Sequence, residues 1–261
     1  MKITNSLLKK LNYGAFSLHL ASALALILTF SIVRKKVNFD TGLWTTKITT
    51  ISEDDRNITL EPYTYIDVDT IALETILVLI FLITAIFHIY YAKSDFYKRE
   101  ISKGYNRLRW LEYSITSTLM IFLLSILSGV KDFDAVLSLC AINATLMSFG
   151  YYYELSKDKI SKVLALSIGF LLLIFIWYVI FRNFFYRVDE VDKAGREVPF
   201  WVYSVLLPMF FWWTSFGIVA TYQYFKGGDF KNYEFYYIIL SYLSKAFMGY
   251  WLAYGMLREP N

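Results

Sequence analysis

Residues 233–255 read YEFYYIILSYLSKAFMGYWLAYG, and this stretch decides how the rest of the chain is interpreted. It is apolar enough and long enough to cross a bilayer, which takes about 20 residues in a helix. Lys245 lies near its middle. An ammonium group at that depth costs roughly 2.5–3.5 kcal/mol on insertion scales. The lysine must therefore lose its proton, pair with a carboxylate, or form a Schiff base with an aldehyde.

The composition indicates an integral membrane protein. Of the 261 residues, 57% are hydrophobic and 20% are aromatic, whereas apolar residues make up about 45–50% of a soluble domain. The run that begins near Leu11 lacks the cleavage site of a signal peptide, so it is interpreted as a spanning helix. The single cysteine, Cys140, excludes an intramolecular disulfide and a cysteine-based metal site. The chain has no basic tail of the kind that binds nucleic acid, so nucleic acid is not an expected partner.

Hydropathy predicts seven membrane-spanning helices in a single domain that covers residues 1–261. The predicted spans are 12–33, 69–92, 107–129, 134–155, 162–185, 199–225 and 233–257. The connection 34–68 is longer than a plain connector. Within it, 43–51 and 58–60 are rich in β-forming residues, and 53–57 is typical of a turn. The predicted fold class is an all-α bundle of seven transmembrane helices, with a small β-hairpin between the first two.

The charges of the connections predict the orientation in the membrane. The N-terminal residues and the connections after the second, fourth and sixth spans are rich in lysine and arginine. The opposite connections, 34–68 and 186–198, hold many of the acidic residues and also Arg34, Lys35 and Lys36, which are outnumbered. The positive-inside rule therefore places the N-terminus in the cytoplasm, and the C-terminus and the hairpin outside.

Few ionisable residues lie inside the predicted spans, and such residues are candidates for function by default. Besides Lys245 they include Glu112, His19 and His88. At about 1.5 Å of helix per residue, both histidines and Glu112 fall in the cytoplasmic half of the membrane. Lys245 is predicted one or two turns deeper, with Glu112 as its candidate counterion.

Plainer interpretations of the same residues stay open at this point. Lys245 could be a structural ion-pair partner, and each histidine could be an interhelical hydrogen-bond donor. Glu112 could be neutralised by Arg109, three residues earlier on the same helix face. Glu234 lies near the end of a span, where contact with solvent is expected. The aromatic run 210–213 is by default core and lipid-facing packing.

The combination of motifs resembles the heliorhodopsin family, a group of retinal-binding rhodopsins with an inverted membrane orientation. The segment 109–118, RWLEYSITST, is similar to the counterion motif of that family, and Ser241-x-x-x-Lys245 matches its retinal-attachment motif. Similar features are the INAT run at 142–145, Phe149-Gly150, the stretch 198–216, and the pair His19 and His88. The match extends over all the predicted spans, and the connection 34–68 is its weakest part.

The resemblance implies that Lys245 holds retinal as a covalent Schiff base, all-trans in the dark, with Glu112 as counterion. Ser241, one helical turn before Lys245, is placed to hydrogen-bond near them. A proton-accepting polar cavity is implied on the cytoplasmic side, lined by His19, His88, Thr84 and Tyr113. The chromophore is expected to lie against Trp110, Leu146, Phe210, Trp212, Trp213 and Phe216.

The expected function is light sensing, without enzymatic activity, through a slow photocycle in which a proton moves into the cytoplasmic cavity. No second carboxylate follows Glu112 before Asp132, which argues against a standard outward proton pump. One alternative is a light-gated passive proton conductor, and another is a retinal-free seven-helix receptor or scaffold. The resemblance implies a homodimer in the cell membrane, in contact with lipid. An unidentified cytoplasmic signalling partner is also expected.

Overall fold

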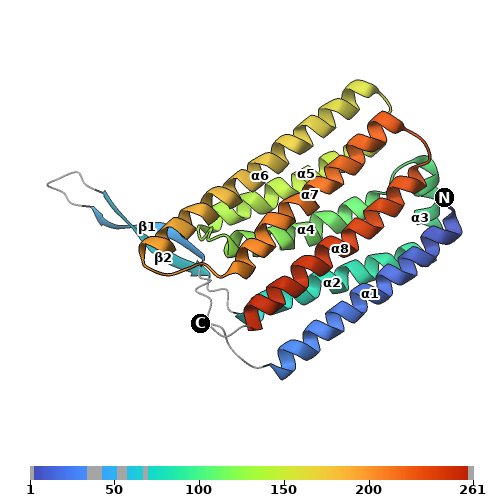
Figure 1. Cartoon of the computed structure of the whole chain (residues 1–261). Coiled ribbons are helices and arrows are strands. Elements are labelled where there is room, and N and C mark those ends of the chain that lie inside the picture. The colour runs from blue at the N-terminus through green and yellow to red at the C-terminus, as the bar shows by residue number, and fades with distance from the viewer. Residues whose placement is uncertain (1–2, 34–42, 52–57, 67–69, 258–261) are drawn as a thin grey trace.

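The computed structural model describes residues 3–33, 43–51, 58–66 and 70–257, which form a bundle of helices with two strands at one end (Figure 1). The long helices are α1 (Asn5–Ile32), α2 (Thr70–Lys93), α4 (Arg107–Leu127), α5 (Phe133–Leu155), α6 (Lys159–Lys193), α7 (Phe200–Lys226) and α8 (Phe230–Leu257). A short helix, α3 (Asp95–Lys103), and the strands β1 (Leu43–Ile51) and β2 (Ile58–Ile66) complete the described elements.

The long helices follow one another around the bundle. Contacts join α1 to α2, α2 to α4, and then each helix to the next through α8, which also packs against α1 and α2. α1, α4, α6 and α8 begin at the end of the bundle where α3 lies, while α8 finishes at the opposite end, near the strands (Figure 1). The end that carries α3 is called the N-terminal end below.

Six helices in the described part of the chain are long and apolar enough to span a membrane, namely α1, α2, α4, α5, α6 and α7. α8, the seventh predicted span, is not among them, because its tyrosine and serine residues, together with Lys245, lower its mean hydropathy. It has 28 residues, the same number as α1, and it packs within the bundle. The structure therefore places α8 with the spanning helices by its packing and not by its hydropathy.

Two helices extend well beyond their predicted limits. α1 begins at Asn5 rather than at 12, because the Thr4 side chain caps its first turn by accepting a hydrogen bond from the Leu7 N–H. α6 continues to Lys193 rather than ending at 185. Its last turns are polar and carry the ion pair Arg187–Glu190 at 2.6 Å. Hydropathy detects only the apolar part of a helix, so both extensions were missed.

The connection between α2 and α4 contains a helix that hydropathy did not predict. In α3, Tyr97, Glu100 and Ile101 are buried, while the opposite face is polar. Ser94 caps its start, and Gly104, at φ 89°, ends it in the left-handed conformation that glycine adopts without strain. A Ser cap, buried residues four apart and a terminal glycine are the signals that could have identified it.

The start of α4 sets the position of the candidate site. Asn106 accepts a hydrogen bond from the Arg109 N–H at 3.1 Å and so fixes the first turn. From there, Arg109, Glu112 and Thr116 are buried at spacings of three and four residues. Such residues lie on one face of a helix, so one stripe of α4 carries polar side chains into the bundle.

The two strands pair antiparallel, with Leu43 opposite Ile66 and Ile51 opposite Ile58. β2 continues to Ile66, beyond the predicted limit at residue 60. The predicted turn at 53–57 lies outside the described residues, as do 34–42 and 67–69. The side of the membrane on which these strands lie stays a prediction.

Candidate functional site

Lys245 and Glu112 form an ion pair inside the bundle. Lys245 Nζ lies 3.1 Å from Glu112 Oε1, and the two residues are 3% and 1% exposed. Nζ also donates a hydrogen bond to Ser241 Oγ at 2.8 Å. Thr84 Oγ1 donates to Glu112 Oε1 at 2.9 Å, and Thr116 Oγ1 lies 2.9 Å from the same oxygen. These hydroxyl groups offset part of the cost of removing the two charges from water.

The side chain of Lys245 accounts for its contact with Glu112, although Lys245 was predicted one or two turns deeper in the membrane. A helical side chain leans toward the N-terminus of its helix. Nζ therefore lies beside Ser241, one turn earlier, and meets Glu112 there. Arg109 does not neutralise Glu112: its guanidinium group pairs with Glu154 and Glu234 at the N-terminal end.

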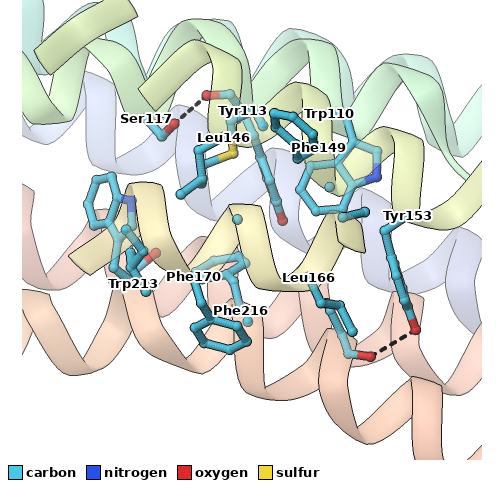
Figure 2. A pocket seen from close by; sticks show the side chains of 18 of the residues that line it. Trp110, Tyr113, Ser117, Leu146, Phe149, Tyr153, Leu166, Phe170, Trp213 and Phe216 are labelled. Carbon is cyan, nitrogen blue, oxygen red and sulfur yellow. Dashed lines mark hydrogen bonds between the residues drawn. The ribbon is translucent and has the colours of Figure 1, made fainter. Parts of the chain in front are cut away.

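A mostly apolar cavity runs between α4, α5, α6, α7 and α8 and includes Lys245 in its wall. Figure 2 shows Trp110 and Tyr113 on one side, with Phe170 and Phe216 across the space from them. The lining residues are Trp110, Tyr113, Ser117, Met120, Leu146, Met147, Phe149, Gly150, Tyr153, Ala165, Leu166, Gly169, Phe170, Leu173, Trp213, Phe216, Gly217, Ala220, Ser244 and Lys245.

Two glycines allow aromatic rings to approach the helices around this cavity. A Cβ atom on Gly150 would overlap the ring of Trp110, and one on Gly217 would lie 2.8 Å from the ring of Phe170. Since such distances are not tolerated between non-bonded carbons, both rings need a glycine at the facing position. The shape of the cavity wall thus depends on these two residues.

Four of the six residues predicted to lie against the chromophore line the cavity, namely Trp110, Leu146, Trp213 and Phe216. Phe210 and Trp212 do not. Phe210 lies one turn from Trp213 and packs on Trp177 of α6, with ring centroids 5.6 Å apart. Trp212 is about 100° around the helix from Trp213, and its ring lies 6.5 Å from that of Phe247 on α8.

The two histidines stack on each other close to the ion pair. Their ring centroids are 5.5 Å apart with an angle of 10° between the planes. His88 Nδ1 lies 2.8 Å from Asn12 Oδ1, while both ring nitrogens of His19 and Nε2 of His88 have no hydrogen-bond partner among the described residues. Buried nitrogens without a protein partner often bind ordered water. The polar cavity beside the histidines stays a prediction.

Tyr113 and Thr84, the other residues predicted for the polar cavity, lie in different places. Thr84 contacts Glu112, as described above. The Tyr113 ring lines the apolar cavity, with its centroid 5.0 Å from Lys245 Nζ, and its hydroxyl group donates to the Tyr237 carbonyl at 3.1 Å. The reason is helical phase, since Tyr113 follows Glu112 by one residue and so points about 100° away from it.

A buried polar cluster at the N-terminal end was not predicted as a unit. Arg109 pairs with both Glu154 of α5 and Glu234 of α8. Asn106 Nδ2 donates to Glu234 at 2.8 Å, and the Asn106 N–H donates to Glu154 at 2.9 Å. Glu234 is 1% exposed, so the expectation of a solvated residue was wrong. An arginine and two glutamates at the same end of three helices were the available signal.

The chain is similar in fold to solved structures of rhodopsins. For the transmembrane domain of Salpingoeca rosetta rhodopsin phosphodiesterase, the TM-score is 0.69 at 14% identity, and the match covers 97% of this chain and 84% of that one. A light-driven proton pump from Leptosphaeria maculans has a TM-score of 0.68 at 14% identity, covering 95% of each chain. Exiguobacterium sibiricum rhodopsin has a TM-score of 0.65 at 15% identity, covering 96% of this chain and 95% of that one.

These identities are low, so the solved structures establish a rhodopsin-like fold and nothing further. No curated protein matches the chain. The family model described as Heliorhodopsin matches residues 8–257, which is nearly the whole sequence. The chain is therefore an integral membrane protein that belongs to the heliorhodopsin family.

Proposed function

We propose that this protein is a light sensor that holds retinal covalently on Lys245. The observation that supports this most directly is the position of Lys245 Nζ, in the wall of an apolar cavity and 3.1 Å from Glu112 Oε1. When bound, retinal would form a protonated Schiff base with this lysine and would supply light absorption and double-bond isomerisation.

The residues around Lys245 fit such a group. The cavity that reaches the lysine is lined largely by aromatic and aliphatic side chains, which suit a long hydrocarbon. Trp110, Tyr113, Leu146, Trp213 and Phe216 would hold it. The buried lysine with one carboxylate beside it supplies both the attachment point and the counterion. A structural ion pair alone would not account for an apolar cavity that ends at the lysine.

The chain's own residues then control the charge on the Lys245 nitrogen. Glu112 stabilises a positive charge there, and the Thr84 and Thr116 hydroxyl groups hold the carboxylate in place. Ser241 accepts a hydrogen bond from the nitrogen. The stacked histidines lie on the side of the pair toward α1 and α2, so a proton released at Lys245 would move to Glu112 and then toward these rings.

The first experiment is expression with all-trans-retinal. We expect a coloured pigment that bleaches with hydroxylamine, and flash photolysis should show a slow photocycle. A colourless protein after reconstitution would contradict the proposal and would favour a retinal-free receptor or scaffold. The slow photocycle separates a sensor from a transporter, because a sensor needs a long-lived state in which a partner can respond.

A passive, light-gated proton conductor is the second candidate. It is favoured by three histidine nitrogens near Glu112 that have no hydrogen-bond partner among the described residues and could accept and release protons. Patch-clamp recording under illumination separates the two functions. A stationary photocurrent that reverses with the proton gradient would establish conduction, whereas no photocurrent at any voltage would exclude it.

We also propose that the N-terminal end faces the cytoplasm and meets a signalling partner there. Exposed basic residues at that end include Lys9, Lys10, Arg99, Lys103 and Arg107, as the positive-inside rule requires. Labelling of a Lys103→Cys variant in a Cys140→Ser background with a membrane-impermeant reagent tests the orientation. Labelling from inside only is expected, and labelling from outside would show that the N-terminal end faces away from the cytoplasm.

We also propose a homodimer, on the basis of the family. Measurement of the mass of the detergent-solubilised pigment tests it.

A further inference from the structure

Three hydrogen bonds in series, between four side chains, link His88 to the polar cluster at the N-terminal end. His88 Nδ1 lies 2.8 Å from Asn12 Oδ1, and Asn12 Nδ2 lies 3.2 Å from the Tyr97 hydroxyl. The Tyr97 hydroxyl in turn donates to Glu234 Oε1 at 3.1 Å. All four residues are at most 3% exposed, and they come from α2, α1, α3 and α8.

The partners of Asn12 decide which of its side-chain atoms is the oxygen. Asn12 Nδ2 lies 2.9 Å from the Leu8 carbonyl oxygen, and a carbonyl oxygen can only accept a hydrogen bond. The nitrogen must therefore face Leu8, since the opposite orientation would bring two acceptors together. It follows that Asn12 Oδ1, which can only accept, faces His88.

The orientation of Asn12 also determines which ring nitrogen of His88 carries a hydrogen atom. Because Asn12 Oδ1 accepts, His88 Nδ1 must carry a hydrogen atom. In a neutral imidazole only one ring nitrogen is protonated, so His88 Nε2 holds the lone pair. Nε2 is buried and has no hydrogen-bond partner in the described part of the chain. His88 therefore has a free proton-accepting atom at a defined position.

At the other end of this series of hydrogen bonds, the Tyr97 hydroxyl group acts as the donor to Glu234. Burial and then the nearby Glu234 carboxylate raise the pKa of Tyr97 well above its ordinary value. The phenol thus keeps its proton and donates to Glu234, while it accepts from Asn12. Each hydrogen bond in the chain is directed toward the Glu234 carboxylate, which Arg109 holds in place.

We propose that Asn12 is a positioning residue that makes Nε2 the proton-accepting atom of His88, and that its amide ends the proton path there. This inference rests on the proposed function for the source of the proton. An amide donates from nitrogen and accepts at oxygen, so it cannot take a proton from His88 and pass one to Tyr97 without changing its bonding. The proton must return to Glu112 instead of leaving through Tyr97 and Glu234.

The tautomer can be measured directly. The chain has two histidines, so ¹⁵N-histidine labelling yields four ring-nitrogen signals, which a His19→Phe variant assigns. In the dark protein we expect the His88 hydrogen on Nδ1, with Nε2 unprotonated. Asn12→Leu should weaken the Nδ1–H signal because nothing then selects that tautomer. Tyr97→Phe removes the hydrogen bonds of the Tyr97 hydroxyl to Asn12 Nδ2 and to Glu234, but it keeps the Asn12 contacts with Leu8 and His88, so it should leave the signal unchanged.

A second experiment tests whether the Asn12 amide prevents proton transfer from His88 to Tyr97 and Glu234. In the wild type, a pH-indicator dye should report no light-induced proton release on the N-terminal side. Asn12→Asp replaces the amide with a carboxyl group, which can accept a proton on one oxygen and donate from the other, so release should appear. Ser22→Ala, a buried change elsewhere on α1, should behave as the wild type.

The outcomes separate this inference from the proposed function. If the wild type forms no pigment, the proposed function fails, although the tautomer can still be read in the unilluminated protein. If the pigment forms but His88 carries its hydrogen on Nε2, the inference alone is overturned. Proton release by the wild type that Asn12→Leu abolishes would also overturn it, because Asn12 would then be part of the path.

Discussion

Arg109 and Glu112 lie one turn apart on the buried face of α4, yet their charges are balanced by different partners. Arg109 pairs with Glu154 and Glu234, while Glu112 pairs with Lys245. The arginine thus leaves Glu112 free to act as the counterion of the lysine. The bundle holds two separate electrostatic centres, one at the N-terminal end and one beside the cavity.

Lys245→Ala should abolish the pigment, because no other lysine lines the cavity within the described residues. Visible absorption after reconstitution with retinal is the measurement. Lys231→Ala, at the start of the same helix and outside the cavity lining, is the control and should keep its colour. Colour that survives in Lys245→Ala would show that retinal is attached elsewhere.

Glu112→Gln should shift the absorption to longer wavelength. The carboxylate stabilises the positive charge beside it in the ground state more than in the excited state, where that charge moves away. Removing one partner of a buried ion pair typically destabilises a protein by about 3–5 kcal/mol, so a lower melting temperature is expected too. Glu190→Gln, an exposed change on α6, should alter neither property. An unchanged spectrum in Glu112→Gln would mean that another anion serves.

Arg109→Met should destabilise the protein by roughly 3–5 kcal/mol, because two buried carboxylates lose their cation. Thermal unfolding in detergent measures the loss. Adding Glu154→Gln and Glu234→Gln should recover part of it, since the uncompensated charges are then gone. Arg187→Met removes an exposed pair and should change stability by about 0–1 kcal/mol. Equal losses for both arginines would contradict the buried-cluster interpretation.

Gly150→Ala should disturb the cavity, because the new methyl group overlaps the ring of Trp110. Overpacking of this kind costs about 1–3 kcal/mol, and displacement of the ring should also shift the absorption. Gly169→Ala is the matched control: Gly169 also lines the cavity, but a Cβ there meets nothing within 4 Å. Unchanged stability and absorption in Gly150→Ala would show that the Trp110 ring is not held against α5.

His19→Ala and His88→Ala should keep the pigment but change the rates of the photocycle, since neither ring contacts Lys245 as a hydrogen-bond partner. Because the two rings stack at 5.5 Å, the effects of the two substitutions should not add in the double variant. Flash photolysis of the single and double variants measures this. Additive effects would show that the histidines act independently.

Much of this protein could be predicted from local properties of the sequence. A long apolar run predicts a spanning helix wherever it occurs, and an ionisable residue within such a run is expensive enough to indicate a function. Lys245, Glu112 and the two histidines were identified in this way, whereas Ser241 was identified from the family motif that it forms with Lys245. α8 was identified by its length, although its polar residues keep its hydropathy below that of the other helices.

The tertiary structure decided everything that depends on how helices are rotated and packed. The pairing of Arg109 with Glu154 and Glu234 joins residues far apart in the chain, and no periodicity predicts it. The exclusion of Phe210 and Trp212 from the cavity follows from the rotation of α7, which only its neighbours determine. In the same way, the tautomer of His88 is set by Asn12 on another helix. The sequence by itself determined which residues carry charge in the membrane, because that cost is local, whereas their partners depend on distances that exist only in the folded bundle.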